Sequence, residues 1–256
     1  MNPTLELPTF IGLIPARYAS TRFPGKPLAM LGDKTMIECV YRRVADVMDD
    51  VAVATDDSRI AEAVNAFGGR VVMTSTSHRS GTDRVREAYH TLGSKADVVI
   101  NIQGDEPFIA HEQLHSLMEC FKDADVDIAS LVRPFAANRP FAELEDPNTP
   151  KVVMDDCGNA LYFSRSVIPY VRNHPRDEWP SLHQYYTHVG LYGYRAPVLD
   201  KISQLPQSNL ELAESLEQLR WLQAGYTIRM ACTDSPTIGI DTPEDLEAAL
   251  RLLNRQ

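Results

Sequence analysis

The stretch VAVATDDSRIAEAVNAFGGRVVM, residues 51–73, contains the pattern that decides the fold. Its apolar runs at 51–55 and 70–73 have the length of buried strands. Between them, apolar side chains recur on one helical face, at Ile60, Val64 and Phe67. A strand, a helix and a second strand at this spacing form a right-handed crossover between parallel strands. The stretch therefore predicts a largely parallel sheet covered by helices.

The same alternation continues along the rest of the chain. Further strands are predicted at 10–14, 97–102, 127–132, 151–155, 160–163, 187–194 and 227–232. The DDCGNA stretch predicts a hairpin between two of these strands. We also expect a long loop at 172–186, one helix at 210–225 and a last helix capped by Thr242. We therefore expect an α/β, Rossmann-like, three-layer fold with a mainly parallel mixed sheet. It forms a single domain over 1–256 with a smaller lobe at about 130–200.

Composition excludes several classes of protein. The 256 residues carry a formal net charge of −10, which argues against a general nucleic-acid binder. No window is long and apolar enough to cross a membrane, and the N-terminus lacks the basic region of a signal peptide. The four cysteines are far apart and predict free, buried thiols in a reducing cytoplasm: Cys39, Cys120, Cys157 and Cys232.

Charged residues follow two strands of the predicted sheet. IPARYASTRFPGKP, residues 14–27, places Arg17, Arg22 and Lys26 after the first strand, and QGDEP places Asp105 after another. Parallel strands bring their carboxyl ends to one edge, where ligands of such sheets bind. Three cations there suit a triphosphate, and a carboxylate suits a phosphate-bound divalent metal. The alternative explanation for the three cations is a solvated basic loop, and for Asp105 it is an aspartate in a turn. Asp241 in GIDTPED could be a second carboxylate for the metal, or simply a residue at the start of a helix.

Other polar positions are less specific when taken alone. Ser80, Gly81 and Thr82 precede a helix, where main-chain amides can bind an anion or a base edge, or simply be capped. The second half adds a cation, an imidazole, a phenol, a carboxylate and an amide, at Arg165, His188, Tyr192, Glu217 and Gln218. Structural roles are the alternative for the histidine and the tyrosine.

The order of these motifs resembles that of the 3-deoxy-manno-octulosonate cytidylyltransferases, also called CMP-Kdo synthetases. The resemblance covers about residues 10–250 and rests on IPARYASTRFPGKPL, ATDD, HRSGTDR, NIQGDEP, ALYFSR, HVGLYGYR, LEQLR and GIDTPED. It implies a nucleotidyltransferase fold and transfer of CMP from CTP to 3-deoxy-D-manno-octulosonate (Kdo), with release of pyrophosphate, for lipopolysaccharide biosynthesis. It also implies Mg²⁺, a cytoplasmic homodimer joined through the smaller lobe, and neither nucleic-acid nor membrane partners.

The resemblance also implies a role for each matching residue. Arg17, Arg22 and Lys26 match the triphosphate loop, with Arg17 and Lys26 catalytic, and Ser80, Gly81 and Thr82 match the cytosine and ribose segment. Asp105 and Asp241 match the catalytic, metal-binding aspartates. The sugar-acid site is matched by Gln103, Arg165, His188, Tyr192, Glu217 and Gln218.

Two other functions stay open at this point. The first is a cytidylyltransferase for another acidic sugar, such as sialic acid or an 8-amino analogue of Kdo. The second is a non-catalytic nucleotide-binding protein on the same fold, which would bind CTP without turnover. The acidic pair of Asp105 and Asp241 favours an enzyme.

Overall fold

A computed structural model describes residues 7–19, 23–236, 239–240 and 242–253 of the chain. These residues divide into two compact units. The first comprises residues 1–115, 193–203 and 236–256, and the second comprises residues 116–192 and 204–235. The chain passes from the first unit to the second within helix α4 (His111–Glu119) and returns within strand β10 (Tyr186–Arg195).

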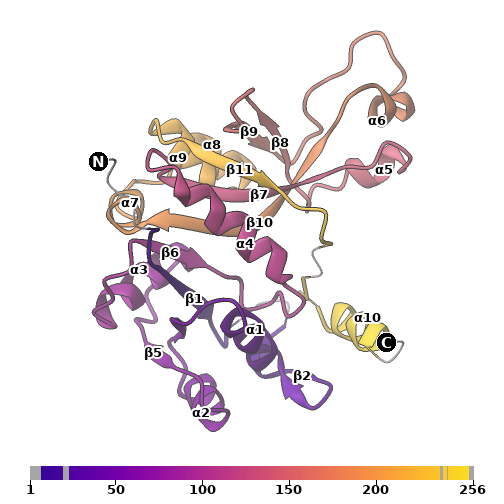
Figure 1. The fold of residues 1–256 in the computed structure, drawn as a ribbon. Helices are drawn as coiled ribbons and strands as arrows, with labels where there is room; N and C mark the ends of the chain where they lie inside the picture. The colour runs from indigo at the N-terminus through magenta and orange to yellow at the C-terminus, as the bar shows by residue number, and fades with distance from the viewer. Residues whose placement is uncertain (1–6, 20–22, 237–238, 241, 254–256) are drawn as a thin grey trace. The chain divides into compact units, whose positions relative to one another are not determined.

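The first unit is built on a parallel sheet in the order β6-β1-β4-β5 (Figure 1). Its strands are β1 (Phe10–Ala16), β4 (Val51–Thr55), β5 (Val71–Met73) and β6 (Val98–Asn101). Ala16 pairs with Thr55, and Leu13 pairs with Asn101, so the carboxyl ends of the central strands lie at one edge. The parallel sheet predicted from residues 51–73 is confirmed.

Most helices of the first unit start at a residue whose side chain caps them. The helices of this unit are α1 (Met36–Ala45), α2 (Ser58–Ala66), α3 (Gly81–Thr91), α7 (Ala196–Ile202) and α10 (Pro243–Leu253), with the short 3₁₀ helix η1 (Lys26–Leu28) and the hairpin β2 (Met30–Leu31) and β3 (Lys34–Thr35). The side chains of Thr35, Asp57 and Ser80 accept main-chain hydrogen bonds at the starts of α1, α2 and α3. Thr242 and Asp245 exchange hydrogen bonds at the start of α10, as a capping box does, which confirms the predicted cap.

The second unit combines parallel and antiparallel pairing. Its strands are β7 (Ile128–Pro134), β8 (Lys151–Met154), β9 (Ala160–Ser164), β11 (Ile228–Cys232) and the first part of β10. β11 is parallel to β7, whereas β8 is antiparallel to both β9 and β10. The predicted β8–β9 hairpin is confirmed, and its turn needs Gly158, whose φ of +78° is unfavourable for residues with a side chain. Its helices are η2 (Cys120–Lys122), α5 (Phe141–Leu144), η3 (Arg176–Glu178), α6 (Trp179–Leu182), α8 (Asn209–Glu214) and α9 (Gln218–Gln223).

The single helix predicted at 210–225 is wrong, because the structure has two short helices there. α8 ends at Glu214, and the next residue, Ser215, adopts a left-handed conformation with φ +51°. The guanidinium of Arg165 donates hydrogen bonds to the carbonyls of Glu214 and Ser215. Side-chain donors therefore satisfy carbonyls that a continuous helix would satisfy itself. The apolar periodicity carries no sign of this contact, because Arg165 lies far away in the sequence.

The loop predicted at 172–186 is also more ordered than expected. It contains η3 and α6, and it buries Trp179 and Tyr185 against Phe135 and Leu144. These aromatic side chains form a small core of their own, which stabilises a segment that is otherwise polar.

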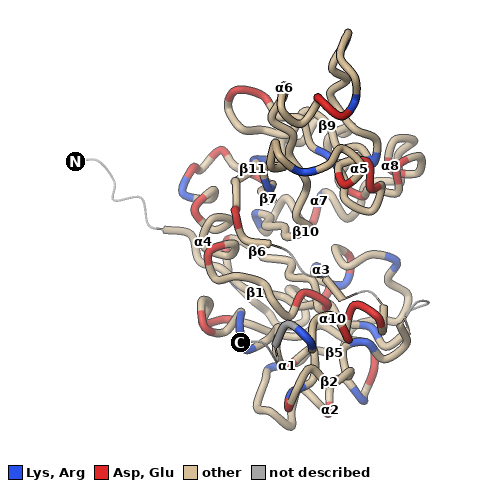
Figure 2. The backbone as a smooth tube through the Cα atoms, turned by 90° about the vertical axis from the view of Figure 1, so that its right-hand side faces the viewer, with Lys and Arg blue, Asp and Glu red and all other residues tan. Residues whose placement is uncertain are grey.

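Composition-based predictions had mixed outcomes. All four cysteines are unbonded, as predicted, but Cys157 and Cys232 are exposed rather than buried. None of the helices among the described residues is long and apolar enough to cross a membrane. Acidic and basic residues are interspersed along the backbone (Figure 2), so a basic site on this acidic chain must be a local feature. The mixed α/β class with a mainly parallel sheet is confirmed.

The loop after β6 passes close over the end of β1. The amide of Ile102 donates to the carbonyl of Leu13 at 3.0 Å, and the loop then crosses β1 at Gly104. A Cβ atom on Gly104 would lie 2.9 Å from the carbonyl oxygen of Pro15, closer than such atoms approach one another. Gly104 is therefore required by the distance between the two segments.

We predict that Gly104→Ala lowers the free energy of unfolding by about 1–3 kcal/mol, because the added methyl group must displace main chain rather than a flexible side chain. Urea denaturation measures the change. Gly190→Ala is the matched control, since a Cβ there meets no atom within 4 Å. Equal stability of the two variants would contradict the prediction.

Candidate active site

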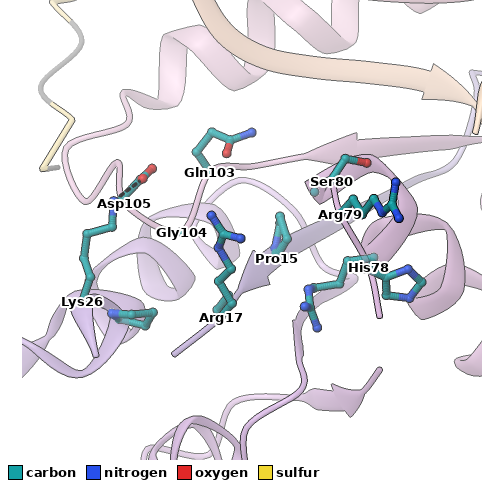
Figure 3. Close-up of a pocket in the computed structure, with 13 residues that line it drawn as sticks. Pro15, Arg17, Lys26, His78, Arg79, Ser80, Gln103, Gly104 and Asp105 are labelled. Atoms are coloured by element: carbon teal, nitrogen blue, oxygen red, sulfur yellow. Dashed lines mark hydrogen bonds and ion pairs between the residues drawn. The ribbon is translucent and has the colours of Figure 1, made fainter. Parts of the chain in front are cut away.

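A cavity of about 260 Å³ lies at the carboxyl edge of the first unit's sheet (Figure 3). Residues 15–17 at the end of β1, residues 26–27 of η1 and residues 103–105 after β6 line it on one side. Residues 78–81, which lead into α3, and the side chain of Arg84 complete the lining. The sheet edge predicted to bind a ligand is therefore hollowed, and the loops predicted to converge there do so.

Lys26 and Asp105, which the sequence analysis placed at one edge of the sheet, form an ion pair. Nζ of Lys26 lies 2.5 Å from Oδ2 of Asp105, and the two side chains are 13% and 32% exposed (Figure 3). A pair of this kind, partly shielded from water, interacts more strongly than one on an open surface. It joins the loop after β1 to the loop after β6, and it leaves the Asp105 carboxylate accessible from the cavity.

The remaining cations of the cavity fall into two groups. Arg84 is buried, and its guanidinium donates to Oδ2 of Asp56 at 2.8 Å and to Oγ1 of Thr74 at 2.6 Å. Arg17 and Arg79 are exposed, and no carboxylate among the described residues pairs with either of them. In Figure 3, Arg17 stands between the Lys26 and Asp105 side of the cavity and the His78 and Arg79 side. The two exposed guanidinium groups are thus available to an anion from solution.

Arg79, His78 and Arg84 were not predicted as site residues. All three lie within or beside the HRSGTDR motif, from which only Ser80, Gly81 and Thr82 were selected. The basic character of the flanking positions was the available signal. Nε2 of His78 contacts the carboxylate of Glu87, which also accepts from the amide of Ser75 at 2.9 Å, so His78 is fixed within the cavity wall.

The start of α3 contributes main chain to the cavity. Ser80 caps the helix, since its Oγ accepts from the amide of Asp83 at 3.1 Å. Ser80 and Gly81 line the cavity, whereas Thr82 is buried and does not. Amides at the start of an 11-residue helix carry partial positive charge and favour a bound anion. Gln103 lines the same cavity from the opposite loop.

Two predicted residues, Arg22 and Asp241, lie outside the described part of the chain. The amide of Ile240 donates to the main-chain carbonyl of Asp105 at 3.0 Å. Ile240 itself is fully buried in a core that includes Leu31 and Met36. Ile240 is therefore attached to the main chain of Asp105.

The second unit holds the remaining predicted residues, and Arg165 is the most tightly bonded of them. Its Nε, Nη1 and Nη2 donate to the carbonyls of Glu214, Pro147 and Ser215 at 2.6, 2.7 and 3.2 Å. The Glu214 carboxylate accepts from Ser164 Oγ at 2.7 Å and from the Arg165 amide at 2.9 Å. These bonds fix the guanidinium in place between two chain segments, one at Pro147 and one at residues 214–215.

His188 and Tyr192 lie on one face of β10 and contact each other. Their ring centroids are 5.3 Å apart, and Tyr192 packs edge-on against Trp221 of α9. The His188 ring also packs against Phe163 and bonds to Ser130 Oγ at 3.0 Å. Although part of the residue stays accessible, this enclosure of the ring lowers the His188 pKa to about 3, because burial disfavours the charged form. His188 is therefore neutral at pH 7.

Glu217 and Gln218 differ in their surroundings. The Glu217 carboxylate pairs with the guanidinium of Arg220 one turn later. Gln218 is 5% exposed, and its Nε2 has no hydrogen-bond acceptor among the described residues. A buried amide donor without a protein partner is uncommon and is a reason to expect a ligand or a water molecule there.

A family model described as cytidylyltransferase matches residues 11–228. The chain belongs to the cytidylyltransferase family. Relatives named 3-deoxy-manno-octulosonate cytidylyltransferase from Bacteroides thetaiotaomicron and Parabacteroides distasonis are each 60% identical to it. The alignments cover 96% and 95% of this chain, and 99% and 98% of those proteins. The family predicted from the motifs is confirmed.

Solved cytidylyltransferase structures agree with the fold. CMP:2-keto-3-deoxy-manno-octonic acid synthetase complexed with CTP matches with a TM-score of 0.88 at 44% identity. The match covers 96% of this chain and 99% of that chain. A cytidylyltransferase from Leptospira borgpetersenii matches with a TM-score of 0.63 at 16% identity, over 97% of this chain and 87% of that one. At that identity the likeness concerns the fold alone.

We predict that Arg79→Gln weakens CTP binding about 3- to 10-fold, because it removes an exposed cation from the cavity wall. Isothermal titration calorimetry measures the dissociation constant. Arg70→Gln is the control, since Arg70 is also exposed but pairs with Asp50 and does not line the cavity. Unchanged affinity in Arg79→Gln would contradict a role in anion binding.

His188 generates a prediction about pH. Between pH 6.5 and about 3 the unfolded chain protonates this imidazole while the folded chain does not. Its contribution to stability is therefore present above pH 6.5 and is lost as the pH falls. We expect the free energy of unfolding of His188→Gln to fall less between pH 7 and pH 4.5 than that of the wild type. Parallel urea-denaturation profiles would contradict this expectation.

Proposed function

We propose that this cytidylyltransferase transfers CMP from CTP to Kdo, giving CMP-Kdo and pyrophosphate and so activating Kdo for lipopolysaccharide biosynthesis. The observation that carries the proposal is the 60% identity, over nearly the whole chain, to proteins named for this reaction. The cavity adds physical support, because it combines exposed cations with an accessible carboxylate on the edge of a parallel sheet.

The nucleotide is assigned to the first unit's cavity. Arg17, Lys26 and Arg79 supply positive charge for the triphosphate, and Arg22 stays a prediction from the sequence for the same role. The segment of Ser80, Gly81 and Thr82 is assigned to the cytosine and ribose, with Ser80 and Gly81 facing the cavity. An acidic protein can hold a triphosphate here because the basic residues are concentrated at one edge of the sheet.

The chemistry requires no covalent intermediate on the protein. The anomeric hydroxyl oxygen of Kdo forms a bond to the α-phosphorus of CTP, and the bond from that phosphorus to the bridging oxygen of pyrophosphate breaks. The hydroxyl proton passes to solvent. Arg17 and Lys26 stabilise the negative charge that collects on the departing pyrophosphate. Positioning of two anions beside each other is the main task of the site.

Mg²⁺ is proposed as the cofactor, held by Asp105 and Asp241. Asp105 suits this ion, because its partly exposed carboxylate lines the cavity beside Lys26. No group of three or more metal-binding side chains occurs in the described ranges, and Mg²⁺ commonly needs only one or two carboxylates when phosphate oxygens and water supply the rest. When bound, the ion would neutralise phosphate charge and lower the pKa of the attacking hydroxyl.

The residues of the second unit assigned to the sugar acid are Arg165, His188, Tyr192, Glu217 and Gln218. Gln103, which lines the cavity of the first unit, stays a prediction for the same substrate. Each terminal nitrogen of Arg165 carries a second N–H group beyond the one bonded to main chain, and these suit the Kdo carboxylate. Neutral His188 suits a sugar hydroxyl rather than a carboxylate. Nε2 of Gln218, for which the described ranges hold no acceptor, supplies a buried donor for another hydroxyl.

A homodimer in the cytoplasm is proposed, with the smaller lobe as its interface. The second unit exposes large apolar side chains beside its aromatic core, with Tyr170 70% and Leu182 50% exposed. Exposed apolar groups of this size favour contact with another protein surface. Use of CTP supports the cytoplasmic location, and neither nucleic acid nor membrane is proposed as a partner.

Pyrophosphate release tests the function directly. The protein is incubated with CTP, Mg²⁺ and one sugar at a time: Kdo, its 8-amino analogue or sialic acid. We expect the fastest release with Kdo, and faster release with the analogue would revise the sugar but keep the reaction. Release with sialic acid alone would contradict the proposal, and CTP binding without any release would favour the non-catalytic alternative.

We predict that Asp105→Asn lowers the rate of pyrophosphate release at least ~100-fold, because the reaction depends on metal-assisted charge neutralisation. Asp50→Asn is the control, since Asp50 is likewise ion-paired, with Arg70 at 2.6 Å, but lies outside the cavity. Turnover near the wild-type rate in Asp105→Asn would remove this carboxylate from the metal site.

A further inference from the structure

Tyr18 contacts Gly25 at the base of the loop between them, and the residues on either side of this contact are the cations Arg17 and Lys26. The Tyr18 carbonyl accepts from the amide of Gly25 at 2.9 Å, so the chain on the two sides of the loop is joined there. Gly25 has φ +73°, and a Cβ atom on it would lie 3.1 Å from the Tyr18 ring. The ring therefore packs on main chain at a position where glycine is favoured twice, by backbone conformation and by the close approach.

Arg59 of α2 contacts the same ring. Its guanidinium carbon lies 3.3 Å from the ring centroid, a cation–π contact. The guanidinium is held in turn by Asp57, which accepts from Nε at 2.9 Å and from Nη2 at 2.6 Å. Asp57 is fixed because it also caps α2 through the amide of Arg59. The contact thus links the loop to the end of β4 and the start of a helix.

The positions of Arg17 and Lys26 depend on the contact between Tyr18 and Gly25. Arg17 directly precedes Tyr18, and Lys26 directly follows Gly25, so the bond between Tyr18 and Gly25 sets the separation of the two cations. Both cations line the cavity (Figure 3). Electrostatic stabilisation is most effective when the charges are held in place before the substrate arrives.

We propose that the Tyr18 cluster, composed of Tyr18, Gly25, Asp57 and Arg59, positions Arg17 and Lys26 for the substrate's phosphate groups. The four residues are positioning residues, since none of them is assigned to the substrate itself. The inference rests on the proposed function for the identity of the anion. It adds that the geometry of the triphosphate loop is fixed from α2, an element with no assigned part in the reaction.

Four variants separate this role from general stability. Arg59→Gln and Tyr18→Leu remove the cation and the ring, whereas Tyr18→Phe keeps the ring and is the conservative variant. Arg42→Gln is the matched control, because Arg42 is 52% exposed against 55% for Arg59. Arg42 likewise bonds a carboxylate, that of Glu38 at 2.8 Å, and lies 5.7 Å from the centroid of the Phe67 ring.

The readouts are the dissociation constant of CTP without sugar, measured by calorimetry, and kcat and KM for CTP in the pyrophosphate assay. We expect Arg59→Gln and Tyr18→Leu to raise the dissociation constant and KM about 3- to 10-fold. We also expect both to lower kcat, because the displaced Arg17 and Lys26 stabilise the departing pyrophosphate. Tyr18→Phe and Arg42→Gln should stay within about 2-fold of the wild type. Thermal melting temperatures should not separate Arg59→Gln from Arg42→Gln.

Two results would overturn the proposal. One is wild-type CTP affinity in both Arg59→Gln and Tyr18→Leu, and the other is an equal loss of affinity in Arg42→Gln. Failure of the proposed function gives a different result, namely a wild-type protein that binds CTP without releasing pyrophosphate from any of the sugars. In that case the dissociation constants still test the Tyr18 cluster.

Discussion

The ion pair between Lys26 and Asp105 joins two loops whose residues are 79 positions apart in the sequence. Its geometry depends on the crossing of the loop after β6 over the end of β1, where only a glycine at position 104 leaves room for the carbonyl of Pro15. Cations from one strand and a carboxylate from another are thereby fixed at one edge of the sheet. The main-chain carbonyl of Asp105 also accepts a hydrogen bond from the amide of Ile240, which attaches a third segment to this point.

Pairing of charges explains how a chain with net charge −10 can favour an anionic substrate. Lys26 pairs with Asp105 in the cavity wall, and Arg84 of the same wall pairs with Asp56, which does not line the cavity. The guanidinium groups of Arg17 and Arg79 remain exposed there. The field felt by an incoming phosphate therefore comes from these nearby charges rather than from the overall charge, because ions in solution screen distant groups.

The second unit shows why periodicity alone mispredicted one element. Residues 210–225 have the apolar spacing of a continuous helix. The carbonyls of Glu214 and Ser215 nevertheless accept hydrogen bonds from the guanidinium of Arg165. The break gives Glu217 and Gln218 a helix start of their own, next to the aromatic group of His188, Tyr192 and Trp221. A long-range contact thus sets both the end of α8 and the position of two predicted sugar-site residues.

The parallel sheet, the strand ends that carry charge and the family could be predicted from the sequence, since periodicity and motif order are local properties of the chain. The sequence also selected Arg17, Lys26, Ser80, Gly81, Gln103 and Asp105, which the structure brings to one cavity. The folded arrangement was needed to show which cations are paired, that Arg79 and His78 line the cavity, and that Thr82 is buried and does not. Charge pairing, burial and ring contacts depend on residues far apart in the chain, so no local pattern encodes them.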